Sequence, residues 1–209
     1  MGVAERRARE KELRRETILD AAKDVFSRKG YQGATMEEIA ALAEVSPATL
    51  YLYFSNKSEL YASLNIKMLA FLCRRLEQVA GQKGLEPPEK VRRLAHAMHD
   101  VYTFDPLILT NVLHMQASQE LTELSPELKE QINSMAAQGL RLMAGIFQQG
   151  IEQGHFKPHH PVALADLVWA VFSGLVLWEE SKRGFAPDKD YLQTTLELAI
   201  ETMARGISN

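Results

Sequence analysis

Two helix-start signals lie within a dozen residues of each other in the stretch TMEEIAALAEVSPATLYLYFSNKSEL (residues 35–60). Thr35 with Glu38 forms a capping box, and Ser46 is followed by Pro47, a residue favoured at the first helical position. Helices this short cannot both bury much of their surface. We therefore predict two short helices joined by a tight turn, one of which presents its outer face to a partner.

The rest of the chain has helical periodicity, with no sustained alternation and no Asn-Gly turn to indicate strands. We expect a first helix at residues 10–29, ending at Gly30, and short helices at 35–43 and 46–54. Asp105 and Ser125 are further cap candidates. The longer helices are expected at 57–81, 88–103, 106–120, 126–153, 161–182 and 187–206. This predicts an all-α fold of about nine helices, with an N-terminal three-helix unit (1–56), a C-terminal bundle (57–209) and the 57–81 helix shared between them.

Composition narrows the class of protein. One cysteine, Cys73, argues against a disulfide framework or a thiolate metal cluster. No signal peptide is visible, and the apolar stretch 167–178 is shorter than the roughly 18–20 residues that span a bilayer. We expect a cytoplasmic protein with no membrane partner. The net charge is −3, yet the first fifteen residues hold six basic and three acidic side chains. That bias favours a polyanion partner at this end, the alternative being a solvated helix start.

The two short helices are typical of a helix-turn-helix, whose second helix lies in the major groove of DNA. The positions expected to face inward are apolar: Ile39, Leu42, Val45, Leu50 and Phe54. The positions expected at the outside or rim are Pro47, Ala48, Thr49, Tyr51 and Tyr53. Small side chains let the helix approach the bases, and hydroxyls donate to phosphates. Lys57 adds a cation near free helix N–H groups. Alternatively, the tyrosines pack sideways.

The segment ETILDAAKDVFSRKGYQGATMEEIAALAEVSPATLYLYFSNKSELYASL closely resembles the DNA-binding domain of the TetR family of transcriptional regulators, with dense similarity over residues 14–64. The resemblance implies a homodimer on a palindromic operator, usually a repressor released by a small ligand. It also implies phosphate contacts from Thr35 and Lys57 and backbone contacts from Tyr51 and Tyr53, of which Tyr51 also has reach to a base. The positions that it implies at or near base edges are Ser46, Pro47, Ala48 and Thr49.

One position departs from the family pattern. Family members often have glycine in the turn where this chain has Glu44. If the backbone is left-handed there, a non-glycine residue costs on the order of 1 kcal/mol. The carboxylate also lies near the expected DNA surface, so we expect somewhat reduced affinity and an unchanged fold.

The helix expected at 161–182 is apolar nearly all round, which is typical of a helix buried on every side. With the last helix it predicts a two-fold four-helix interface, and the family resemblance also places the dimer there. The alternative is the central core helix of a monomer. The expected dimer contacts are Leu164, Leu167, Ala170, Val171, Gly174, Leu175, Trp178, Leu192, Leu196, Ala199 and Met203.

Bulky, adaptable side chains in the bundle favour a pocket for a small apolar or aromatic effector. For each of them ordinary core packing is the alternative, and it is the family resemblance that supplies the expectation of a pocket. The expected lining is Met98, Tyr102, Leu113, His114, Met143, Phe147, Trp169 and Phe172, with His114 as a polar group.

The sequence gives little support for a metal site or for catalytic activity. His96 with His99, or the loop trio His155, His159 and His160, offers a possible metal site without a matching carboxylate pattern. A di-iron site needs paired Glu-x-x-His motifs, and only residues 152–155 fit. We expect no metal, no cofactor and no catalysis. A purely structural bundle leaves the exposed tyrosines without a role. The helix-turn-helix pattern predicts a DNA-binding protein, and the resemblance to the TetR family implies a ligand-responsive regulator, usually a repressor, that binds operator DNA as a dimer.

Overall fold

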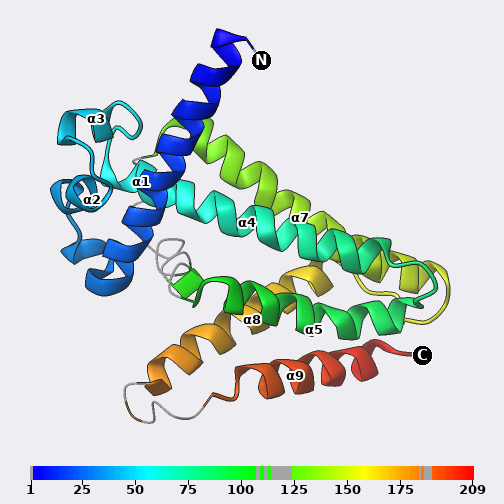
Figure 1. Ribbon diagram of the computed structural model, residues 1–209. Helices are drawn as coiled ribbons and strands as arrows, with labels where there is room; N and C mark the ends of the chain where they lie inside the picture. Colours follow the sequence, from blue (N-terminus) through cyan, green and yellow to red (C-terminus); the bar gives the residue numbers. More distant parts are fainter. Residues whose placement is uncertain (1, 107–108, 111–112, 114–123, 184, 186–189) are drawn as a thin grey trace.

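The computed structural model describes residues 2–106, 109–110, 113, 124–183, 185 and 190–209, and over this part of the chain the fold is all-α, as predicted. Helices α1 (Val3–Gly33), α2 (Met36–Leu42) and α3 (Pro47–Tyr51) form a unit at one end of the molecule (Figure 1). Helix α4 (Lys57–Gly81) runs from that unit along the rest of the structure. It therefore belongs to both parts.

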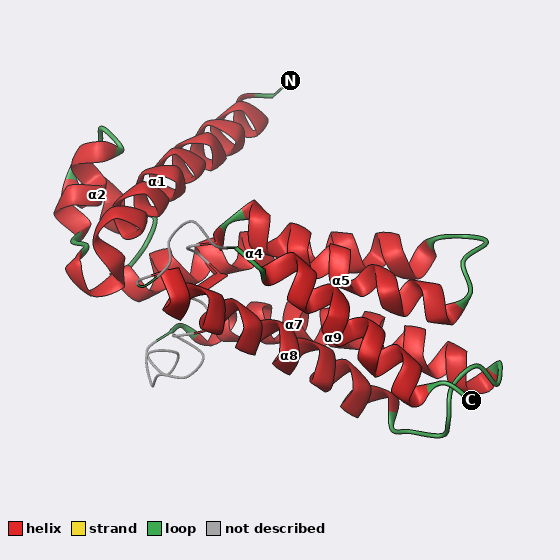
Figure 2. Cartoon of the chain, turned by 90° about the horizontal axis from the view of Figure 1, so that it is seen from below, coloured by secondary structure: helices red, strands yellow, loops and turns green. Residues whose placement is uncertain are grey.

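The second part of the chain is a bundle of α4 with α5 (Pro87–Phe104), α7 (Pro126–Glu152), α8 (Pro161–Arg183) and α9 (Leu192–Ile207). Helix α4 packs on α5 and α7, α9 packs on α5, and α8 packs on α7. Figure 2 shows these helices side by side, with α1 inclined away at one end. The core between them includes fully buried Leu76, Leu94, Met98, Phe147 and Phe172.

Local side-chain chemistry sets four helix starts where the sequence predicts them. In each case a polar side chain preceding the helix accepts a hydrogen bond from a backbone N–H in its first turn. The pairs are Thr35 Oγ1 with Glu38 N at 3.2 Å, Ser46 Oγ with Thr49 N at 3.0 Å, Asn56 Oδ1 with Glu59 N at 2.8 Å, and Ser125 Oγ with Leu128 N at 3.4 Å.

The ends of α1 and α3 differ from the predictions. Helix α1 begins at Val3, seven residues before the expected start, because strong helix formers continue the helix beyond its apolar stripe. Gly30 has φ 69° and interrupts the helix where its end was predicted, but the chain resumes helical geometry to Gly33. Helix α3 ends at Tyr51, and residues 52–53 continue as a turn.

The predicted start of the last helix at 187 is wrong, because α9 begins at Leu192. Asp190 Oδ1 accepts from Leu192 N at 3.0 Å, and Glu179 Oε1 accepts from Tyr191 N at 3.1 Å, so carboxylates satisfy the free amides at this end. The helix expected at 106–120 falls largely outside the described residues.

One residue near the turn between α2 and α3 that was predicted to face inward is exposed in the structure. Ile39, Leu50 and Phe54 are buried and Val45 is half-buried, but Leu42 is 44% exposed. Ala43, at 3% exposure, takes the inward place instead. Met36, Ile39, Ala40 and Ala43 are spaced i, i+3, i+4 and i+7, so they share the buried face of the helix, and Leu42 lies outside that face.

Glu44 has φ 54°, so its backbone lies in the left-handed region. This conformation is the condition under which the sequence predicts a strained non-glycine residue. Its N–H donates to Ala41 O at 3.2 Å, and Val45 N–H donates to Ala40 O at 2.9 Å. This pair of bonds is a Schellman motif, which normally places glycine at the position of Glu44. The left-handed backbone on which the predicted strain at Glu44 depends is therefore present.

We expect Glu44→Gly to raise the free energy of unfolding by about 1 kcal/mol, because glycine adopts positive φ without the Cβ penalty. Glu44→Ala removes the same carboxylate but keeps the penalty, so it serves as the control and should give no such gain. Urea denaturation of both variants measures the difference. Equal stabilities for the two variants would mean that backbone strain at this position is negligible.

The apolar stretch 167–178 lies within α8, which is long and apolar enough to cross a membrane by length and composition alone. A single such helix is weak evidence, because core helices of soluble proteins pass the same test. Only 28% of its 18-residue apolar window is buried. Leu167 and Trp178 are 45% and 60% exposed. The protomer therefore does not bury α8 on every side, and an apolar face is left uncovered.

Candidate nucleic-acid interface

The first turn of α3 forms an exposed, nearly uncharged surface. Ser46, Pro47 and Ala48 are exposed, and Thr49 is half-buried. Ser46 Oγ lies 2.8 Å from Thr49 Oγ1, and either hydroxyl can donate. Small side chains at the start of an exposed helix allow close approach to base edges in a major groove.

The two tyrosines of this region have different surroundings. Tyr51 is 48% exposed, whereas Tyr53 is half-buried against the apolar core. Tyr51 therefore has the larger part of its surface available to a partner. Leu52 between them is 81% exposed, a feature that the inward–outward assignment did not anticipate.

Lys57 has a structural role that the sequence did not predict. Its Nζ donates to Tyr31 O at 2.8 Å and to Ala34 O at 3.0 Å, and it lies 4.5 Å from the centre of the Tyr31 ring. The ammonium thus ties the end of α1 and the following loop to the start of α4. An ammonium has three N–H donors, so one donor remains for a phosphate.

We expect Lys57→Met to lower the free energy of unfolding by about 1–3 kcal/mol, because two carbonyls lose their donor. Lys67→Met is the matched control: it removes the same charge from α4 at a half-buried position for which the structure gives no hydrogen bond within the described residues. Thermal unfolding of both variants provides the comparison. A Lys57 variant as stable as the Lys67 variant would contradict the bracing role.

The ion pair between Lys29 of α1 and Glu38 of α2 fixes these two helices to each other. The hydrogen bond from Lys29 is the largest cause that lowers the pKa of Glu38. Thr35, expected at a phosphate, is exposed at the cap of α2. The helix preceding α3 is therefore held in place independently of any partner.

The residues expected to bind an effector are mostly packed in the core. Met98, Tyr102, Leu113, Phe147 and Phe172 are buried, and His114 lies outside the described residues. The Tyr102 hydroxyl pairs with Arg183, and burial raises the pKa of Tyr102. These side chains support the bundle, and none of the five lines the apolar pocket described next.

An apolar pocket of about 230 Å³ lies between α4, α7 and α8. Met143 and Trp169, two of the expected residues, line it. Its other lining residues include Leu69, Leu72, Ala136, Ala137, Gly139, Leu140 and Asp166. The signal missed in the sequence is the run of small residues in α7, which leaves space opposite the leucines of α4.

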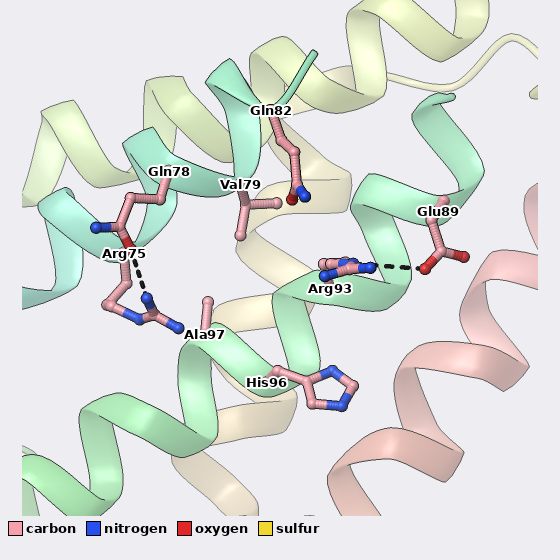
Figure 3. Close-up of a pocket in the computed structure, with 8 residues that line it drawn as sticks. All are labelled: Arg75, Gln78, Val79, Gln82, Glu89, Arg93, His96 and Ala97. Carbon is pink, nitrogen blue, oxygen red and sulfur yellow. Dashed lines mark hydrogen bonds and ion pairs between the residues drawn. The ribbon is translucent and has the colours of Figure 1, made fainter. Parts of the chain in front are cut away.

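A second, polar cleft of about 590 Å³ lies between the second half of α4 and the first half of α5 (Figure 3). Arg75 and Gln78 come from α4, and Arg93 and His96 from α5. Arg75 forms an ion pair with Asp100, and Arg93 Nε lies 3.5 Å from a Glu89 oxygen. Its charges are therefore already matched by neighbouring carboxylates, and the apolar pocket is the better candidate for an uncharged ligand.

The histidines and the cysteine have ordinary surroundings. His96 lies 3.7 Å from Glu197 and His155 lies 3.2 Å from Glu86. Over the described residues, no group of three or more His, Cys, Asp and Glu side chains is arranged to hold a metal ion. Burial raises the pKa of the Cys73 thiol, so it stays protonated at neutral pH.

The expected dimer contacts divide into three sets by their burial in the protomer. Leu164, Leu192 and Leu196 are buried inside the protomer, so a partner cannot contact them. Val171, Leu175, Ala199 and Met203 are half-buried. Four expected contacts are exposed: Leu167, Ala170, Gly174 and Trp178. Together with Val162, Leu177, Tyr191 and Leu198 they make up the exposed apolar face of α8 and α9.

An N-terminal helix-turn-helix joined to a helical bundle defines a class of DNA-binding transcriptional regulators. The sequence model described as "Bacterial regulatory proteins, tetR family" matches residues 18–64. The "Fatty acid metabolism regulator protein" of Bacillus subtilis is 31% identical over 148 residues, covering 71% of this chain and 73% of the relative. The uncharacterised HTH-type transcriptional regulator YhgD of the same organism is 28% identical over 189 residues, covering 90% and 94%.

Solved structures have the same fold. The transcriptional regulator FadR from Bacillus subtilis, in complex with stearoyl-CoA, superposes with a TM-score of 0.71 at 24% identity, over 92% of this chain and 98% of that one. The chain belongs to the TetR family of transcriptional regulators. It is a regulator of transcription and not an enzyme.

Proposed function

We propose that this protein is a homodimeric, cytoplasmic repressor that binds a palindromic operator through α3 and is released by a small apolar effector. The observation that carries the proposal is the exposed first turn of α3, held by its own caps and presented beside Tyr51. We assign residues 1–56 to DNA reading and 57–209 to dimerisation and effector binding. Base-edge contacts are proposed for Ser46, Pro47, Ala48 and Thr49, and phosphate contacts for Thr35, Tyr51, Tyr53 and Lys57.

The dimer part of the proposal rests on the uncovered face of α8 and α9. Leu167, Trp178 and Leu198 are 45%, 60% and 66% exposed. Soluble proteins rarely leave a contiguous apolar patch of this kind in water. A two-fold interface between two copies of this face covers it and creates a second α3 for the second half-site.

The effector part rests on the pocket between α4, α7 and α8. Leu69 and Leu72 belong to α4, the same helix that Lys57 anchors to the DNA-reading unit. A ligand that binds better when these leucines are displaced shifts α4 and with it the spacing of the two α3 helices. A coupling of about 1–3 kcal/mol changes operator affinity roughly 5- to 150-fold.

The pocket favours an apolar or aromatic ligand, with Asp166 as a charged lining group. A fatty-acyl compound is the first candidate, since a 31%-identical relative is named as a fatty acid metabolism regulator and FadR was solved with stearoyl-CoA. Leu72→Trp tests the site, because an indole fills this space. We expect the variant to bind operator as the wild type does but to lose the response to the effector.

The test of the function is operator binding measured by fluorescence anisotropy over a range of salt concentrations, with and without acyl-CoA, free fatty acid or aromatic acid. Binding through several phosphates must weaken steeply as salt rises. The proposal predicts a steep negative slope and a loss of affinity with one of these ligand classes. Salt-independent binding would argue against DNA recognition, and operator affinity unchanged by all three classes would contradict the assigned effector chemistry.

A further inference from the structure

The first four turns of α1 lie outside the helix-turn-helix and project from the molecule. The helix begins at Val3, whereas the family match begins at residue 18. Figures 1 and 2 both show the N-terminal end of α1 extending away from the remaining helices. Residues 4–14 are all exposed. Nothing inside the protomer therefore accounts for the side chains along this segment.

Three cations of this segment share one helix face. Arg7, Lys11 and Arg14 are spaced i, i+4, i+7 and lie on one face, here called the basic stripe. Glu5, Glu12 and Glu16 lie on the opposite face at i, i+7, i+11. Neighbouring like charges at i, i+3 and i, i+4 destabilise an isolated helix, whereas a merely solvated helix gains from pairs of opposite sign. Repulsion among the three cations of the basic stripe is reduced when a further anion meets them.

The basic stripe faces a groove shared with the DNA-reading unit. All three of its cations line a groove of about 670 Å³, together with Thr17, Leu13, Glu10 and, from the end of the α3 region, Tyr53. Glu10 is paired with Arg6 at 2.9 Å, so its charge is offset. Within the described residues no carboxylate lies within 4 Å of the stripe's nitrogen atoms.

Arg15 fixes the direction of the segment. Its guanidinium donates to Ser63 Oγ of α4 at 3.1 Å and lies 5.1 Å from the centre of the Phe54 ring. The base of the projecting segment is therefore attached both to α4 and to the turn after α3. The orientation of the basic stripe relative to the recognition helix is set before DNA binds.

We propose that Arg7, Lys11 and Arg14 bind backbone phosphates of DNA outside the half-site read by α3, so that each protomer covers flanking duplex of any sequence. This inference rests on the proposed operator binding. The seven residue steps from Arg7 to Arg14 span about 10 Å of helix, a length comparable to three base-pair steps at about 3.4 Å each. Three cations distributed over this length can reach phosphates that lie within about three base-pair steps of one another, and such contacts position the protein without reading bases.

The test compares two duplexes that carry the same operator, one trimmed to the palindrome and one with ten base pairs of arbitrary sequence on each side. Affinity is measured by fluorescence anisotropy at several salt concentrations with the full-length protein. We expect the wild type to bind the flanked duplex more than tenfold more tightly. A triple variant, Arg7→Ala, Lys11→Ala and Arg14→Ala, should bind both duplexes alike. Its salt slope on the flanked duplex should fall by about 5, from three phosphates in each of two protomers at about 0.9 each.

Arg9→Ala is the matched control for Arg7→Ala, since both remove an exposed arginine from the same helix two residues apart, but Arg9 lies on the acidic face. We expect Arg9→Ala to change neither affinity nor slope, and Arg7→Ala to weaken binding to the flanked duplex alone. Wild-type binding that ignores the flanks, or equal effects of the two substitutions, would overturn the inference while leaving operator binding intact. Absence of any operator binding by the wild type would overturn the proposed function and the inference together.

Discussion

Gly174→Arg is expected to convert the protein to a folded monomer that binds operator at least 100-fold more weakly than the wild type, because linking two binding modules contributes about 10²–10⁴ in affinity. Gly174 is exposed on α8, and a Cβ atom there meets no other atom within 4 Å. Within the protomer the substitution improves helix propensity by roughly 0.8–1 kcal/mol. In the proposed dimer it places a charge in an apolar interface, at a cost of several kcal/mol per ion.

Gly145→Arg is the matched control for this prediction. Gly145 is also an exposed helical glycine with open space around its Cβ position, but it lies on α7, away from the apolar face of α8 and α9. It should leave both the dimer and operator affinity unchanged. Sedimentation velocity gives the oligomeric state, and anisotropy gives the affinity. A Gly174 variant that remains dimeric would show that the interface lies elsewhere.

Lys23→Met is expected to lower the free energy of unfolding by about 1–3 kcal/mol and to weaken operator binding several-fold, because a buried carboxylate loses its counter-charge. Lys23 of α1 lies 2.6 Å from the carboxylate of Asp105, whose side chain is only 5% exposed at the end of α5. The pair joins the DNA-reading unit to the bundle at a second point besides α4. Without it, α1–α3 have more freedom to rotate about α4.

A double-mutant cycle with Asp105→Asn separates this contact from unrelated effects. The coupling energy is the difference between the double variant and the sum of the two single variants. We expect the double variant to be less destabilised than that sum by about 1 kcal/mol or more, because each single substitution already breaks the pair. Additive free energies would mean that Lys23 and Asp105 do not stabilise each other. The ion pair would then not connect the DNA-reading unit to the bundle energetically.

Cap positions could be predicted from the sequence because capping depends on only four neighbouring residues. Thr35, Ser46 and Ser125 each make the expected hydrogen bond. Comparison with the family pattern, which often has glycine in this turn, singled out Glu44 as a residue strained if its backbone is left-handed. The structure has that left-handed backbone. The early start at Val3 was missed, because charged residues without an apolar stripe give no periodic signal even where their helix propensity is high.

The candidate sites were harder to predict, since they depend on how helices distant in the sequence pack. Leu164 and Leu167 are the same residue type on the same helix, yet Leu164 is only 7% exposed and Leu167 is 45% exposed. Only the positions of neighbouring helices decide which leucine faces a partner. The pocket likewise depends on where α7 leaves space, and Leu69 and Gly139 gave no sign of it in isolation. Lys57 was correctly singled out, but its bonds to Tyr31 and Ala34 depend on a loop whose course the sequence does not specify.

The most direct test of the account is the selection of bound DNA from a random-sequence pool with the full-length protein. A two-fold dimer with one recognition helix in each protomer predicts an inverted repeat whose half-site centres lie about one helical turn, roughly 34–36 Å, or whole turns apart. Enrichment of a single asymmetric half-site, or no enrichment at all, would contradict a dimer that reads operator DNA through α3.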